Sequence, residues 1–248
     1  MDTTTTPGAG RSKDYSALYL PLAIILAGVM VAGGLYLGLS HQAGSGGQQP
    51  AARVVDVKKV KTEGEPFIGK ADAPLTMAFW SDYQCPFCKA VEVGGVPQIP
   101  TKAAIPEVIK EYVDSGKLRI VFKDFAFLGN DSVTDAEYEH AIWKLYPEKY
   151  YEWRTAMYKA QDEEGDQGFG DEASVVALTA KIAGIDAAKV KADVAAHKAE
   201  YDAAIQADTE EGQSFGVNGT PGFIIGTKAL DGAQEFAAFK AAIDAQLK

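Results

Sequence analysis

The distribution of hydrophobic residues predicts one membrane-spanning segment followed by one folded domain. The longest uncharged run, "ALYLPLAIILAGVMVAGGLYLGLS", covers residues 17–40, and a membrane helix needs about 20 such residues. Glycines within this run would weaken a helix in water but are frequent in membrane helices. Arg11 and Lys13 precede the run, so a cleaved signal peptide is the alternative. The length of the run favours an uncleaved anchor.

Basic residues set the expected orientation of this anchor. Arg11 and Lys13 lie before the span, and the next basic residue is Arg53, so the positive-inside rule predicts a cytoplasmic tail at residues 1–16. The segment 41–62 begins with "HQAGSGGQQPAAR" and is expected to be a flexible linker. The chain is thus predicted to be a single-pass protein of the cell membrane. Its folded domain, residues 63–248, would face the oxidising periplasm or cell surface.

Shorter hydrophobic patterns within the folded part predict both strands and helices. Residues 75–80 are a short apolar run, and residues 118–124 alternate between apolar and polar positions, as strands do. Between them, residues 106–115 carry a proline in the first turn and apolar positions on one helical face. Strand, helix and strand in this order predict a parallel pair with a helical crossover. A weaker strand is expected at residues 54–60.

A helical block at about residues 128–215 is predicted to separate these strands from the end of the chain. Asp186 is expected to cap a long helix in this block. Residues 223–225 and 228–230 then predict a hairpin, and the apolar face of residues 236–247 predicts a last helix.

Charge and composition exclude some functions. The net charge of the 248-residue chain is −10, which argues against nucleic acid as a partner because phosphates would repel the surface. The stretch "QDEEGDQGFGDE" at residues 161–172 departs from a calcium-loop template, because Gly168 is one place late and the twelfth residue is Ala173. A solvated acidic loop is predicted there, and no metal or cofactor is expected.

Cys85 and Cys88 are the two cysteines of the chain, and they lie where a predicted strand gives way to a helix. The first N–H groups of a helix are unpaired and its dipole is positive there, so a Cys85 thiolate would be stabilised. Cys88 lies one helical turn further and can attack a mixed disulfide at Cys85. Pro86 suits the first turn because it has no N–H to lose.

Two other roles for the pair are less well supported by the sequence. A zinc site needs four ligands, and Cys85 and Cys88 supply two. A structural disulfide across two residues would close too small a loop to stabilise much. A redox-active dithiol is therefore favoured.

The stretch "GVNGTP", which ends at Thr220 and Pro221, is a second feature of interest. A proline before a short strand favours an edge or a turn. From the local sequence, a cis peptide bond at Pro221 and an ordinary glycine-rich turn are equally acceptable.

Four stretches taken together resemble the DsbA-like thioredoxin-fold family: "APLTMAFWSDYQCPFCKA", "KLRIVFKDFAFLG", "GVNGTPGFIIGTKALDGA" and the closing helix. The resemblance covers about residues 66–248. It implies an α/β thioredoxin fold, with a central mixed sheet flanked by helices and a helical insertion, here preceded by a transmembrane helix.

The resemblance also implies roles for individual residues. Cys85 would be the exposed nucleophile, Cys88 the resolving thiol, and Pro221 a cis-proline facing them. Thr220 and its neighbours would pair with the backbone of a bound substrate. The expected activity is that of a protein thiol:disulfide oxidoreductase that introduces disulfides into exported proteins and is reoxidised by a quinone-linked membrane partner. The alternatives are a reductase or isomerase of the same fold, and a non-catalytic binding or chaperone module.

The chain departs from the family pattern at three places. Family members often carry a glutamate six residues before the first cysteine, where this chain has Phe79. A buried carboxylate can accept the proton of the second thiol, so in this chain water or another residue would have to accept it. The dipeptide Pro86-Phe87 replaces the Pro-His of the strongest oxidant, which predicts a less oxidising disulfide. Prolines and a Gly-Gly pair after Cys88 predict a short helix at residues 87–93 followed by a loop.

Overall fold

The structure is a computed structural model, and it describes residues 55–162 and 166–247. All of these residues lie in the unit that spans Ala52–Lys248. The predicted cytoplasmic tail and anchor, residues 1–16 and 17–40, lie outside the described residues. No helix in the two described ranges combines the length and the apolar character needed to cross a membrane.

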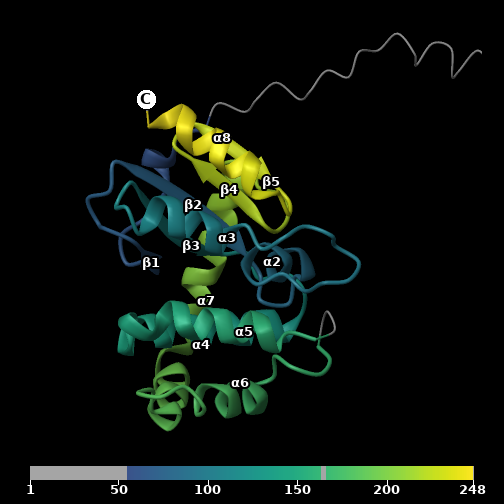
Figure 1. Cartoon of the computed structure of the whole chain (residues 1–248). Helices are drawn as coiled ribbons and strands as arrows, with labels where there is room; N and C mark the ends of the chain where they lie inside the picture. Colours follow the sequence, from purple (N-terminus) through teal and green to yellow (C-terminus); the bar gives the residue numbers. More distant parts are fainter. Residues whose placement is uncertain (1–54, 163–165, 248) are drawn as a thin grey trace, which may run out of the picture. The chain divides into compact units, whose positions relative to one another are not determined.

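A five-stranded mixed sheet forms the centre of the fold, with strand order β1-β3-β2-β4-β5 (Figure 1). The strands are β1 Phe67–Ile68, β2 Leu75–Ser81, β3 Leu118–Asp124, β4 Gly222–Ile225 and β5 Lys228–Asp231. β2 and β3 are parallel, and the other neighbours are antiparallel. The predicted parallel pair and hairpin are therefore confirmed. Six of the seven residues in each of β2 and β3 are buried, as expected for strands covered on both faces.

The crossover between β2 and β3 is broken into pieces, as the prolines predict. Helix α2, Pro86–Glu92, follows β2 directly, and a loop leads to α3, Ile105–Val108. The chain then widens into a π-helical turn at Ile109–Val113. The predicted helix at residues 106–115 is thus present, but its second half is a π turn.

The described residues of the helical insertion form four α-helices: α4 Asn130–Leu145, α5 Tyr150–Ala160, α6 Glu172–Thr179 and α7 Ala187–Ser214. Figure 1 shows α4, α5 and α6 gathered at one end of the sheet, with α7 leading the chain back to it. Asp186 caps α7 as predicted, because its carboxylate accepts from the N–H groups of Ala188 and Lys189. The last helix, α8, spans Phe236–Gln246 and lies beside β4.

Close packing fixes α7 against β2. The indole N–H of Trp80 donates to the carbonyl of Asp208 at 3.0 Å. Gly212 makes this approach possible, because a Cβ at that position would lie 2.8 Å from Trp80 Nε1. The insertion and the sheet are thereby joined at the carboxyl end of β2.

The predicted strand at residues 54–60 is wrong. This segment instead contains a 3-10 turn at Val57–Lys59, stabilised by the Asp56 carboxylate, which accepts from the Lys58 N–H. A backbone bond from Val57 to the carbonyl of Gly226 ties the turn to the rest of the domain. Val57 is nevertheless buried, so the apolar pattern indicated burial correctly and the type of element incorrectly.

Candidate active site

The two cysteines lie at the carboxyl end of β2, at the start of helix α2. Cys85 is the N-cap of α2 and Pro86 occupies its first turn, as the sequence predicts. The N–H of Cys85 donates to the carbonyl of Asp82 at 3.1 Å, which closes the turn between strand and helix. Both cysteines are free thiols.

The burial of the pair differs from the expectation of an exposed nucleophile. Cys85 is 4% exposed and Cys88 is fully buried, so the order of exposure is as expected, but Cys85 is not an exposed residue. The segment around Pro221 covers it: the Cys85 thiol donates to the carbonyl of Thr220 at 3.4 Å. Phe87, two residues after Cys85, is 48% exposed.

The two thiols are electrostatically unequal. A hydrogen bond from Cys88 lowers the pKa of Cys85, and the Thr220 hydroxyl and the N–H groups of Phe87 and Cys88 lower it further, against the opposing effect of burial. Burial raises the pKa of Cys88 well above its usual value, and the neighbouring charge of Cys85 adds to this rise. Negative charge is therefore favoured on Cys85, while Cys88 retains its proton.

The Thr220–Pro221 peptide bond is cis, which settles the alternative that the local sequence left open. Pro221 is buried, and the half-buried Thr220 lies beside both sulfur atoms. The Thr220 hydroxyl has no nitrogen or oxygen partner among the described residues. The structure thus brings together Cys85, Cys88, Thr220 and Pro221, as predicted.

No carboxylate stands at the position of the family glutamate. Phe79 is fully buried there and packs on Phe223, with ring centroids 4.4 Å apart, and on Phe122. The guanidinium of Arg154, from α5, lies 4.2 Å from the centroid of the Phe122 ring. The charged group that lies against the Phe122 ring is therefore a guanidinium.

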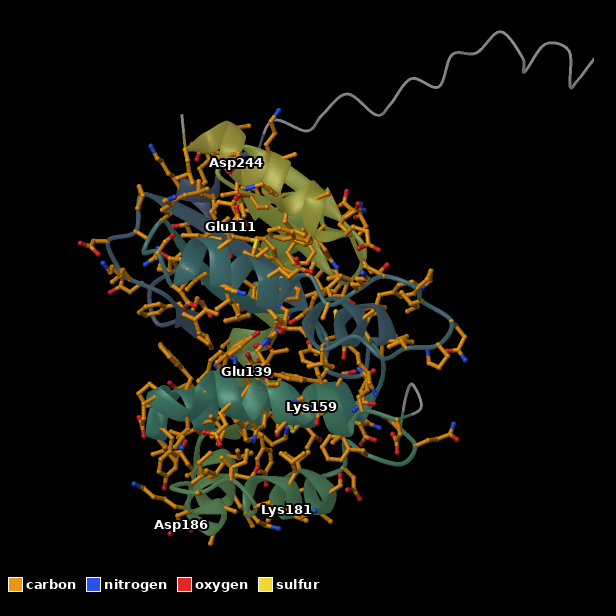
Figure 2. All side chains as sticks on the ribbon, in the orientation of Figure 1. Glu111, Glu139, Lys159, Lys181, Asp186 and Asp244 are labelled. Atoms are coloured by element: carbon orange, nitrogen blue, oxygen red, sulfur yellow. The ribbon has the colours of Figure 1, made fainter. Side chains whose placement is uncertain are left out.

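Arg154 is fully buried and is paired with two carboxylates. Its Nε lies 2.7 Å from Glu92 of α2, and its Nη1 lies 3.2 Å from Glu139 of α4. Figure 2 labels Glu139 on the side of the insertion that faces the sheet. Burial and the nearby charge of Asp124 raise the pKa of Glu139 to about 7, against the effect of Arg154.

The sequence analysis did not identify this group of residues, because it treated residues 128–215 only as a helical block. The signal that was available is the spacing of Arg154, Tyr158 and Gln161 at i, i+4 and i+7, which places these three polar side chains on one helical face.

An apolar groove opens beside the cysteines. It encloses about 460 Å³, and its lining includes Phe87, Thr220 and Ala233. Ile99 and Pro100, from the loop that follows α2, form part of its wall. The groove has no charged lining residue, so it suits uncharged side chains next to the reacting sulfur.

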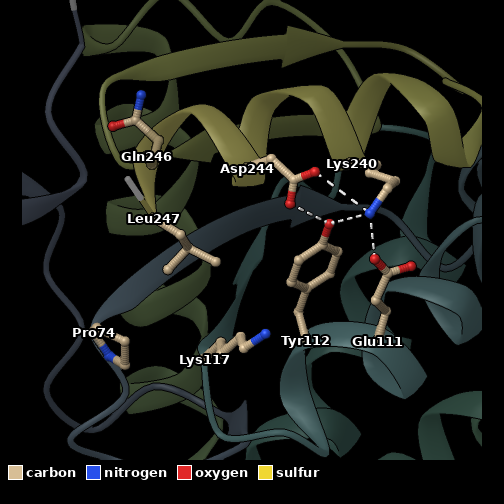
Figure 3. A pocket seen from close by; sticks show the side chains of 8 residues that line it. All are labelled: Pro74, Glu111, Tyr112, Lys117, Lys240, Asp244, Gln246 and Leu247. Carbon is tan, nitrogen blue, oxygen red and sulfur yellow. Dashed lines mark hydrogen bonds and ion pairs between the residues drawn. The ribbon is translucent and has the colours of Figure 1, made fainter.

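A larger pocket, of about 880 Å³, lies elsewhere and is shown in Figure 3. Lys240 pairs there with Glu111 and Asp244, and the Tyr112 hydroxyl donates to Asp244 at 2.6 Å. Because these charges satisfy one another and no thiol lines the pocket, the cysteine pair is the better candidate for chemistry.

Comparison with known proteins places the chain in a family. A family profile described as Thioredoxin matches residues 61–245. A relative from Bacillus anthracis, named "Probable disulfide bond formation protein D", is 26% identical over 181 residues, which cover 73% of this chain and 77% of that protein. The Bacillus subtilis protein named "Disulfide bond formation protein D" is 22% identical over 186 residues, covering 75% of this chain and 78% of that protein.

Solved structures show the same fold. Oxidised BdbD from Bacillus subtilis superposes with a TM-score of 0.64 at 21% identity, covering 79% of this chain and 97% of that one. The thiol-disulfide exchange protein alpha-DsbA2 from Wolbachia pipientis has a TM-score of 0.60 at 24% identity, covering 73% and 86%. The chain therefore belongs to the thioredoxin family as a DsbA-like member, and it is a thiol:disulfide oxidoreductase.

Proposed function

We propose that Cys85 and Cys88 are the redox pair of this enzyme and that they introduce disulfides into exported proteins. The observation that carries the proposal is the inequality of the two thiols at the start of α2. The lowered pKa of Cys85 suits a sulfur that a substrate thiolate attacks and that later departs as a thiolate itself. The raised pKa and complete burial of Cys88 suit a sulfur that meets only Cys85.

The proposed reaction begins with the Cys85–Cys88 disulfide. A substrate thiolate, formed by loss of a proton to solvent, attacks Cys85 Sγ; the Cys85–Cys88 bond breaks, and its electron pair goes to Cys88. A second thiol of the substrate then attacks the substrate sulfur of the mixed disulfide, and Cys85 leaves as a thiolate. The proton of this second thiol balances the one that Cys88 takes up. The substrate is oxidised by two electrons and the enzyme pair is reduced.

Thr220 and Pro221 are proposed to position the substrate. The Thr220 carbonyl lies 3.4 Å from Cys85 Sγ, so a chain that reaches this sulfur passes beside the backbone of Thr220. The apolar groove between Phe87, Thr220 and Ala233 gives room for residues that flank the substrate cysteine.

Membrane attachment and reoxidation complete the proposal. Residues 17–40 would anchor the chain, residues 41–62 would tether the domain, and residues 63–248, with the insertion at about 128–215, would act outside the cytoplasm. A disulfide donor oxidises its substrate and is itself left reduced, so it must then lose two electrons to an acceptor. A quinone-linked membrane partner meets this need, and the names of the Bacillus relatives support a role in disulfide formation.

The first test is the reduction potential of the Cys85–Cys88 pair, measured in glutathione buffers. A value toward about −120 mV supports disulfide donation, whereas a value near about −270 mV would make the chain a reductase. Oxidation of a reduced, unfolded protein provides the second measurement. The Cys85→Ser variant is expected to lose this activity; if it oxidises the substrate as fast as the unmodified chain does, the Cys85–Cys88 pair does not carry the reaction.

A further inference from the structure

Gln161, the residue at which α5 ends, contacts the turn that carries the first cysteine. It is 4% exposed, and its backbone N–H donates to the carbonyl of Met157 at 3.0 Å. Its side-chain Nε2 donates to the carbonyl of Tyr83 and, at 3.0 Å, to the carbonyl of Cys85. A glutamine amide has two N–H bonds, so this one spends both on the segment between β2 and α2.

Two more side chains on the same face of α5 contact this segment. Arg154 Nη2 donates to Ser81 Oγ at 2.8 Å, and the Tyr158 hydroxyl donates to the carbonyl of Asp82 at 3.4 Å. Gln161 lies furthest along this row and reaches the cysteine residue itself.

The backbone of Cys85 is held on both sides. Its N–H donates to the carbonyl of Asp82 at 3.1 Å, and its carbonyl accepts from Gln161 and from the Lys89 N–H at 3.1 Å, which is the first bond of helix α2. The direction of the Cα–Cβ bond is therefore fixed, and the sulfur can only rotate about that bond. The hydrogen bond from Sγ to the carbonyl of Thr220 orients this rotation.

The Tyr83 carbonyl is the second point that Gln161 holds. This carbonyl shares a peptide group with the N–H of Gln84, and that N–H donates to the Asp82 carboxylate at 2.8 Å. The peptide group is thus fixed at its oxygen by Gln161 and at its nitrogen by the buried Asp82. The turn that leads into Cys85 is therefore held on either side of Gln84.

Lys89 returns the contact from α2 to the end of α5. It lies one helical turn after Cys85, and its Nζ donates to the backbone carbonyl of Gln161. The side chain of Gln161 therefore holds the start of α2, while a side chain of α2 holds the backbone of Gln161. This reciprocal pair of contacts keeps the Gln161 amide directed at the turn.

We propose that Gln161 is a positioning residue for the nucleophile, and that it fixes the backbone of Cys85 so that the sulfur faces an incoming thiolate at the positive end of α2. Exchange requires attack on Cys85 Sγ in line with the bond to Cys88 Sγ that breaks, so a fixed direction favours the reaction. The helix start stabilises a Cys85 thiolate only while its first turn is intact. This inference rests on the proposed redox role of Cys85.

The test is the Gln161→Met variant, which has a side chain of similar length and lacks both N–H donors. It is made in a Cys88→Ser background, so that Cys85 is the only thiol of the chain. The rate of alkylation by iodoacetamide, measured from pH 4 to pH 10, gives the pKa of Cys85. This pKa is expected to rise, so that the rate well below it falls about fivefold, as for loss of one hydrogen bond.

Two control variants separate positioning from a general loss of stability. Thr179→Val removes a buried hydrogen bond between α5 and α6, from Trp153 Nε1 to Thr179 Oγ1 at 3.0 Å, which involves no residue of the turn. Gln206→Met makes the same substitution on the exposed side of α7. Both are expected to leave the pKa of Cys85 unchanged. The positioning role is wrong if Thr179→Val raises this pKa as much as Gln161→Met does, or if Gln161→Met leaves it unchanged.

A second measurement uses the unmodified chain and does not depend on the folding of a variant. The side-chain amide protons of Gln161 are followed by NMR and are expected to exchange with solvent far more slowly than those of the exposed Gln206. Equal exchange rates for the two amides would contradict the inference. Failure of the unmodified cysteine pair to exchange with glutathione would instead contradict the proposed function, whatever the pKa of Cys85 in the variants.

Discussion

The ammonium group of Lys123, on β3, lies 2.5 Å from the carboxylate of Asp208, on α7. Its other partners are Glu65 at 3.0 Å and Glu211 at 3.1 Å. The Lys123 side chain is 1% exposed, so one buried cation holds three carboxylates and joins the sheet to the insertion.

Removal of this cation is expected to destabilise the fold strongly. Lys123→Met would leave the carboxylates of Glu65, Asp208 and Glu211 without the buried cation that pairs with them, which costs about 3–5 kcal/mol for a broken buried pair. Urea unfolding measures the loss. The control is Lys191→Met, since Lys191 pairs with Glu172 on the surface. A loss for Lys123→Met no larger than that of the control would show that the buried cluster contributes little.

Stability is expected to fall as the pH rises from about 4 to 9. Burial raises the pKa of both Asp208 and Glu139 to about 7, and hydrogen bonding to Asp124 raises the pKa of His140 to about 9, against the effect of burial. In each case the folded state binds its proton more tightly than the unfolded state does. The stabilisation is complete below the unfolded pKa and is lost as the pH passes the folded pKa.

Urea unfolding at pH 5, 7 and 9 tests this dependence. His140→Gln is expected to flatten the curve between about pH 6.5 and 9, where the unfolded histidine has lost its proton and the folded one retains it. His197→Gln serves as a control at a half-buried histidine of α7 that lies beside the Asp193 carboxylate. Stability that rises toward pH 9 in the unmodified chain would contradict the prediction.

Phe87, between Pro86 and Cys88, is expected to influence the reduction potential of the cysteine pair. Phe87→His would place a hydrogen-bond donor, positive when protonated, beside the Cys85 thiolate and favour the reduced pair. A shift of about tenfold in the equilibrium with glutathione corresponds to about 30 mV. The matched control is Phe127→His, at the other exposed phenylalanine. Equal reduction potentials for the two variants would show that the residue at position 87 does not influence the potential of the Cys85–Cys88 pair.

The Thr220 hydroxyl is expected to stabilise negative charge on the pair. Thr220→Val keeps the shape of the side chain and removes the donor, so the pKa of Cys85 should rise. Thiolate absorbance as a function of pH measures this change. Thr227→Val, in the turn of the β4–β5 hairpin, is the control, since its hydroxyl donates to Gln246. A pKa of Cys85 that is the same in both variants would exclude the hydroxyl as a donor to the sulfur.

Local patterns predicted those parts of the fold that local physics determines. The parallel strands β2 and β3 were evident from their apolar runs, and the cap of α7 from Asp186. The position of Cys85 at a helix start followed from Pro86 and the strand before it. These features depend on neighbours in the sequence.

Features that depend on distant contacts were not predictable in this way. The segment at residues 54–60 has the composition of a strand, but Asp56 stabilises a turn there. The burial of Cys85 depends on the chain around Thr220, which lies 135 positions away. The role of Arg154 could not be read from α5 alone, because the partners that reveal it come from β2, α2 and α4.

The row Arg154, Tyr158 and Gln161 also bears on how the enzyme matures. The cysteines are made about 70 residues before the side chains that hold Ser81, Asp82 and Cys85 in place. The segment between β2 and α2 therefore gains these contacts only after α5 has been made and has packed against it. The geometry around Cys85 and Cys88 is thus completed late in folding, after the helical insertion has formed.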